Sequence, residues 1–220
     1  MNLISAIVPS TWLIPLWLVT LLVLAQLARH TRWDLLANRQ NLNIFLGACV
    51  VTLGLWLIKT GIKPGLNFHM LGATVLTLMF RPWFALFALA LIIGAITAQS
   101  GEFNAFPANY LIMAVTPVSL SWAIFRQVDG KLPNHLFIYI FVNAFFTPAL
   151  AIIAVGLVST AFFTLAEAYP FGYLLEEYLP FYLLMGWAEA FATGMIVTLM
   201  VVYKPEWVAT FDDQRYLYGK

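Results

Sequence analysis

Seven apolar stretches alternate with short polar gaps along most of this chain. A helix needs about 20 mostly apolar residues to cross the hydrocarbon core of a bilayer, and most of the stretches reach that length. The pattern predicts an all-α, polytopic membrane protein with about seven transmembrane helices, forming a single domain over residues 1–220. The spans are expected at residues 9–28, 42–60, 67–80, 82–98, 107–125, 134–163 and 180–203.

The third and fourth stretches are short, and only Arg81 and Pro82 separate them. They form either two shorter spans or a re-entrant pair, and we favour two shorter spans. Pro82 stands where the second of these helices would begin, the position that a helix tolerates best for proline.

Composition excludes several functional classes. Hydrophobic residues make up 62% of the chain and charged residues 10%, which leaves too little polar surface for a soluble domain. A formal net charge of +1 gives no basic surface for nucleic acid. The sequence contains no phosphate-binding glycine loop, so any ATPase would be a separate chain. It also shows no nucleophile–base pair or complete metal site, so we do not expect an enzyme.

The positive charges predict the orientation. With the N-terminus outside, nine basic residues fall in cytoplasmic gaps and only Lys59 and Lys63 fall outside. The positive-inside rule therefore predicts an outer N-terminus and a cytoplasmic C-terminus. The nine are Arg29, Arg32, Arg39, Arg81, Arg126, Lys131, Lys204, Arg215 and Lys220.

Three polar residues at membrane depth are candidates for function, because an ionisable group there costs roughly 2.5–3.5 kcal/mol. They are His69, Asn109 and Glu189. The predicted topology places all three in the outer half, where they are expected to surround one outward-facing pocket. Each also has a structural interpretation. His69 can bond a backbone carbonyl, Asn109 can hold the preceding loop, and Glu189 can be a paired or protonated acid between helices.

Small residues recur at every fourth position of the last span, at Gly186, Ala190 and Gly194. Such a stripe permits close approach of another helix. Glu189 and Thr193 lie beside the stripe, so we expect the carboxylate to point into a seam between helices.

Several segments, in this order and spacing, resemble the CbiM/NikM family. These proteins are the substrate-binding membrane subunits of cobalt and nickel energy-coupling-factor transporters. The segments are Met1-Asn2-Leu3-Ile4, Val8-Pro9-Ser10-Thr11-Trp12, His69-Met70-Leu71-Gly72-Ala73, Arg81-Pro82-Trp83, the stretch from Gly101 to Asn109 with Pro117, and Glu189-Ala190-Phe191-Ala192-Thr193-Gly194.

The resemblance implies a multi-pass substrate-capture component in the bacterial inner (plasma) membrane. Its expected partners are the lipid bilayer, a transmembrane coupling subunit and ATPase subunits. The expected substrate is a divalent metal ion, cobalt or nickel, and no covalently bound cofactor is implied.

The resemblance also implies a set of metal ligands. In the family, these are the N-terminal amine, a backbone nitrogen and imidazole of residue 2, and the histidine of the third-span segment. The matching positions here are Met1, Asn2 and His69, with Asn109 and Glu189 as further pocket candidates. Asn2 departs from the pattern because it has no imidazole. A carboxamide oxygen is a harder ligand, better suited to magnesium or calcium.

Three hypotheses follow. The chain is a capture component for a divalent transition metal with altered ligands. Alternatively, it is a relative of that fold that binds another small solute, or a cation through Glu189 and Asn109. The third hypothesis is a non-transporting scaffold or assembly subunit of a larger membrane complex.

Overall fold

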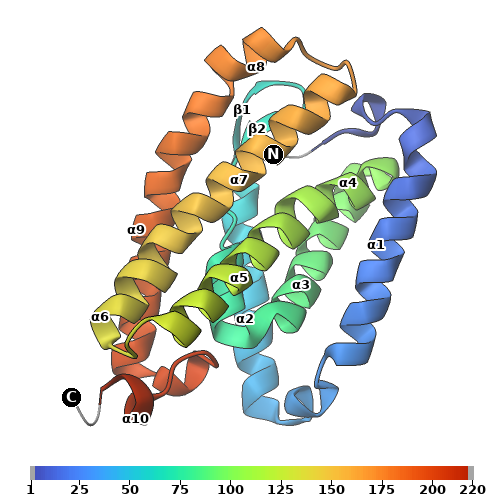
Figure 1. The fold of residues 1–220 in the computed structure, drawn as a ribbon. Helices are drawn as coiled ribbons and strands as arrows, with labels where there is room; N and C mark the ends of the chain where they lie inside the picture. The colour runs from blue at the N-terminus through green and yellow to red at the C-terminus, as the bar shows by residue number, and fades with distance from the viewer. Residues whose placement is uncertain (1–2, 218–220) are drawn as a thin grey trace.

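The computed structural model describes residues 3–217, and its helices form an up-and-down bundle (Figure 1). The principal elements are α1 (Ser10–His30), α2 (Arg39–Leu57), β1 (Thr60–Lys63), β2 (Leu66–Phe68), α3 (Ala73–Ser100), α4 (Phe106–Tyr110), α5 (Thr116–Lys131), α6 (Leu136–Ile138), α7 (Thr147–Leu165), α8 (Phe171–Glu177), α9 (Leu179–Tyr203) and α10 (Asp213–Tyr216). Two π-helical segments, Leu111–Val115 and Tyr139–Phe146, join α4 to α5 and α6 to α7.

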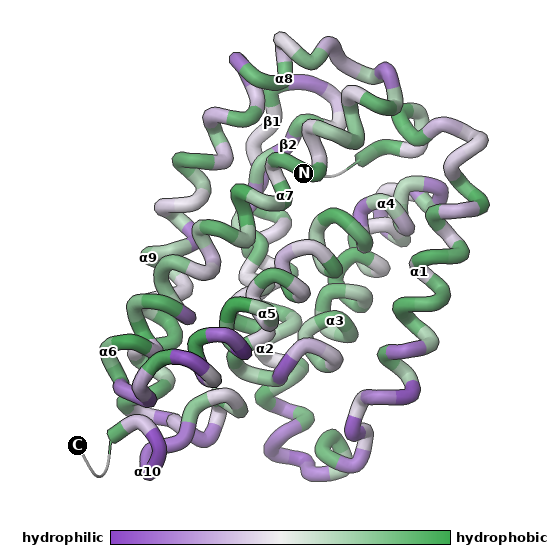
Figure 2. Tube along the Cα trace, in the orientation of Figure 1, coloured by the Kyte–Doolittle hydropathy of each residue, from purple (hydrophilic) through white to green (hydrophobic). Residues whose placement is uncertain are grey.

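Six helical segments within the described residues are long and apolar enough to cross a membrane. Hydrophobic residues run along these helices, and hydrophilic residues gather at the turns, most densely at the end that carries α10 (Figure 2). The segment before α1 lies at the end of the bundle that carries α8, and α10 lies at the opposite end (Figure 1). Which end faces the cytoplasm stays a prediction.

The prediction of about seven transmembrane helices needs a correction at α3. Arg81 has a non-helical backbone with φ 64°, and the chain reverses there. Asn67, before α3, and Ser100, at its end, consequently line the same cavity. The part of α3 before Arg81 has only eight helical residues and is about 12 Å long, so it cannot cross a bilayer alone. The third predicted span is therefore β2, a coil over residues 69–72 and a short helix.

The break at Arg81 is held by the C-terminal segment. The backbone amides of Ala209 and Thr210 donate to the carbonyl oxygens of Met79 and Leu78, at 3.0 and 3.3 Å. The last carbonyl groups of a helix have no partner within it, so these bonds satisfy two carbonyl oxygens at the end of the short helical segment. The reversal is thus part of the packed structure.

A small hairpin precedes the short helical segment. β1 and β2 pair antiparallel, with Thr60 opposite Phe68 and Gly61 opposite Asn67. Gly65, in the turn, has φ 78°, a conformation that favours glycine. The hairpin delivers the chain to His69 at the point where it enters the bundle.

Close packing of α9 against α7 and the π-helical segment before it follows the predicted stripe. The position of a Cβ on Gly186 lies 3.6 Å from the carbonyl oxygen of Ala149, and that on Gly194 lies 3.6 Å from the carbonyl oxygen of Ala144. A side chain longer than that of alanine at either glycine would meet the facing helix. The same packing places Glu189 inside the bundle, with 2% of its surface exposed.

Candidate functional site

His69 follows β2 directly and is buried, with 4% of its surface exposed. Its ring lies 4.4 Å from the ring of Trp56, centroid to centroid, at an angle of 43°. Its Nδ1 lies 3.2 Å from the carbonyl oxygen of Met70, within hydrogen-bond distance. Trp56, in the last turns of α2, donates from Nε1 to the carbonyl oxygen of Leu71 at 2.9 Å. Trp56 therefore fixes the coil that carries His69 and also covers one side of the imidazole.

The N-terminal segment is anchored by Asn109. The Asn109 Oδ1 accepts a hydrogen bond from the Leu3 amide at 2.8 Å, and its Nδ2 donates to the Leu3 carbonyl oxygen at 3.1 Å. Leu3 and Asn109 are both buried. The predicted structural interpretation of Asn109 was to hold the preceding loop, but the segment it holds is the N-terminal one.

A second anchor lies two residues further along. The Ser5 amide donates to a carboxylate oxygen of Glu102 at 2.6 Å. This hydrogen bond lowers the pKa of Glu102 below its usual value, so the carboxylate is the favoured form. Glu102 thus helps to hold the segment against the start of α4.

The N-terminal segment and His69 meet at Trp56. A cavity of about 160 Å³ is lined by Leu3, Trp56 and Asn109, together with residues of α3. Trp56 thus lines the cavity on the side of Leu3 and contacts the ring of His69. The predicted ligands Met1 and Asn2 lie outside the described residues.

Glu189 is bonded to the same coil from the other side. Its Oε1 accepts hydrogen bonds from the backbone amides of Leu71 and Gly72, the latter at 3.1 Å. These amides immediately precede α3, so the carboxylate occupies the positive end of that helix. Glu189 therefore lies in a seam, as predicted, and its partner is backbone rather than another side chain.

The three predicted polar residues do not line one common cavity. Asn109 lines the cavity beside Trp56, His69 a space of about 10 Å³, and Glu189 a cavity of about 420 Å³ between α2 and α9. The coil over residues 69–72 carries His69 and donates two backbone amides to Glu189, so these two residues are connected through the coil. Residues 3–217 contain no group of three or more His, Cys, Asp or Glu side chains that could hold a metal.

Trp56 and Glu102 are parts of this site that sequence reasoning missed. A tryptophan at the end of a span is typical of the membrane interface, so Trp56 carried no separate signal. Glu102 lies in the gap between two predicted spans, and nothing in the sequence connects it with Ser5.

Comparison with known proteins gives related folds. Crystal structures of a transition metal transporter and of a truncated transition metal transporter each superpose with a TM-score of 0.79 and 18% identity. The truncated protein aligns over 92% of this chain and 99% of its own length, and the other over 91% and 92%. At this identity the likeness is one of fold. No curated protein sequence matches the chain.

A family profile gives the remaining assignment. The match runs over residues 2–207, nearly the whole chain, and the profile is described as the cobalt uptake substrate-specific transmembrane region. The chain therefore belongs to the CbiM family.

Proposed function

We propose that this protein captures a divalent transition metal ion, of the cobalt or nickel type, for an energy-coupling-factor transporter. A coupling subunit and ATPase subunits on other chains would supply the energy. The metal is substrate and would enter from the side that the charge distribution predicts to be outside. Family membership supports metal transport, and the finer assignment rests on the site.

The observation that carries the proposal is the pair of hydrogen bonds between Asn109 and Leu3. They fix the backbone of residue 3 in a cavity bounded by Trp56, whose ring also contacts His69. It supports the proposal because Leu3, the residue that follows the proposed ligands Met1 and Asn2, lines a cavity with the tryptophan that contacts His69. Nitrogen ligands of this kind suit nickel(II) and cobalt(II).

The donor set fits such an ion in part. His69 is the one side chain with a strong nitrogen donor among the proposed ligands, and Asn2 lacks the imidazole of the family pattern. The described residues offer no cluster that would replace it. We therefore expect weaker binding than a complete nitrogen set would give. A different small solute, or a scaffold without cargo, is the alternative that the test must exclude.

The test is a binding measurement on purified protein that begins with its own Met1, because a tag would block the amine. Calorimetry with nickel(II) and cobalt(II) should show saturable binding with one site. His69→Ala should abolish it. The matched control is His135→Asn, because His135 caps α6 by accepting a hydrogen bond from the Phe137 amide, and asparagine can still accept there. Absence of binding in the folded wild type would favour the alternative cargo or the scaffold.

A further inference from the structure

Two adjoining cavities form one groove along α2. The first, of about 470 Å³, lies at the end of the bundle that carries Arg81, and the second, of about 420 Å³, lies between α2 and α9. Both are lined by Ile44, Met79 and Trp207, so they adjoin at these three residues. We call the whole the α2–α9 groove.

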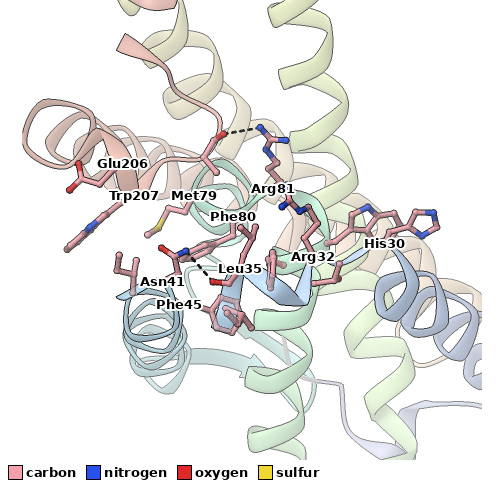
Figure 3. Close-up of a pocket in the computed structure, with 16 residues that line it drawn as sticks. His30, Arg32, Leu35, Asn41, Phe45, Met79, Phe80, Arg81, Glu206 and Trp207 are labelled. Atoms are coloured by element: carbon pink, nitrogen blue, oxygen red, sulfur yellow. Dashed lines mark hydrogen bonds between the residues drawn. The ribbon is translucent and has the colours of Figure 1, made fainter. Parts of the chain in front are cut away.

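The wide end of the groove carries charge. His30, Arg32 and Arg81 lie on one side of it, and Glu206 lies on the opposite side (Figure 3). Arg32 pairs with Asp34 at 2.9 Å, and Glu206 with Lys204 at 3.7 Å. Arg81 donates to the carbonyl oxygen of Ala209 at 3.4 Å and has no acidic partner among residues 3–217.

These groups leave one excess positive charge, on the side of Arg81. The guanidinium groups of Arg32 and Arg81 are exposed and present planar sets of N–H donors. Such donors match the oxygens of a phosphate, and arginine binds them in a forked geometry. The wide end is therefore suited to a phosphate group.

The narrow part is lined mainly by apolar side chains, with Glu189 among its few polar residues, and its length suits a lipid chain. Its α2 wall runs from Asn43 to Leu55, a rise of about 18 Å. One leaflet of a hydrocarbon core is about 15 Å deep. Trp83 and Trp207 stand at the wide end, where tryptophan is enriched at membrane interfaces. A peptide here would leave backbone polar groups unsatisfied, whereas an acyl chain has none.

We propose that the α2–α9 groove binds an anionic phospholipid. The phosphate contacts Arg32 and Arg81, and one acyl chain lies between α2 and α9. Basic pockets between transmembrane helices are a recognised setting for anionic headgroups. This site is separate from the cavity beside His69 and Trp56, and it does not depend on the identity of the cargo.

The charged end is tested by native mass spectrometry of the full chain with phosphatidylglycerol and phosphatidylcholine of identical acyl chains. The wild type should retain phosphatidylglycerol preferentially. Arg32→Gln and Arg81→Gln should each reduce its affinity about five-fold. Arg126→Gln is the control, because Arg126 is exposed on α5 and does not line the groove. Equal retention of both lipids by the wild type, or unchanged preference in the arginine variants, would overturn the proposal.

The apolar end is tested at Gly47, which lines the groove and has open space where a Cβ would stand. Gly47→Leu should fill the groove and reduce retention of both lipids several-fold. Gly54→Leu is the matched control, because Gly54 also has open space around it but does not line the groove. Undiminished phosphatidylglycerol binding in Gly47→Leu would show that no acyl chain occupies the groove and would point to a soluble acidic partner instead. If Arg81→Gln fails to fold, Arg32→Gln still tests whether the charged end binds the phosphate, because Arg32 lies on an exposed turn.

Discussion

The side-chain amide of Asn109 holds the backbone of Leu3 at both of its polar groups, accepting from the amide at 2.8 Å and donating to the carbonyl oxygen at 3.1 Å. An asparagine is one of few side chains that can do both at once. This pair joins Leu3 to a residue 106 positions further along the chain. In the proposed metal site, Asn109 would therefore act as a positioning residue that need not touch the metal.

Asn109→Ala should therefore weaken nickel(II) binding about ten-fold or more, comparable to the loss of a residue that orients metal ligands. The substitution leaves the amide and carbonyl of Leu3 without their buried partners, which costs about 1 kcal/mol or more for each. Calorimetry on the authentic N-terminus measures the affinity. Asn134→Ala, in the loop before α6, is the control, and an unchanged affinity in folded Asn109→Ala would separate the anchor from the site.

Substitutions of Glu189 should lower the stability of the folded protein before they affect any transport role. Glu189→Leu leaves the amides of Leu71 and Gly72 unsatisfied in the bundle, at about 1–3 kcal/mol each. Glu189→Gln keeps an oxygen acceptor and should cost about 1 kcal/mol. Thermal unfolding in detergent measures both variants, and uptake by cells separates a further role. If Gln lowers uptake at normal expression and stability, the charge itself guides a cation; full activity in the Leu variant would remove Glu189 from both roles.

The sidedness of the bundle is open to a labelling test. Cysteine at position 176, in exposed α8, should react with a membrane-impermeant reagent from outside. Cysteine at position 131, at the exposed end of α5, should react only after permeabilisation. The native Cys49 is buried and should stay silent in both conditions. The reverse pattern at the two introduced cysteines would invert the predicted orientation.

The sequence predicts the spans well because transmembrane helices leave a strong signal in hydropathy. The same signal cannot show that the stretch before Arg81 is only half helical. That form depends on Ala209 and Thr210 bonding to Met79 and Leu78 from far along the chain. Hydropathy reports burial in lipid and carries no information about such pairing.

The site is predictable to a similar extent. Sequence pattern picks out His69, Asn109 and Glu189 as polar groups at depth, and the structure buries all three. It does not reveal their partners, since the partners of Asn109 and Glu189 are backbone groups of Leu3, Leu71 and Gly72. Backbone amides are present at every position, so no residue type marks the ones that will be used.

The altered ligand at residue 2 gives the sharpest test of the proposed metal site. Asn2→His restores an imidazole and should strengthen nickel(II) binding by an order of magnitude or more, comparable in size to the effects of ligand-orienting residues. The gain should disappear in Asn2→His combined with His69→Ala, because both imidazoles must reach one ion. Affinity should also fall as the pH drops through the imidazole range, since only the neutral ring binds metal. Calorimetry between pH 5 and 8 on protein with its own Met1 provides the measurement. If the folded Asn2→His variant binds no better than the wild type, Met1, residue 2 and His69 do not converge on one ion, and a different cargo or a scaffold role becomes the better account.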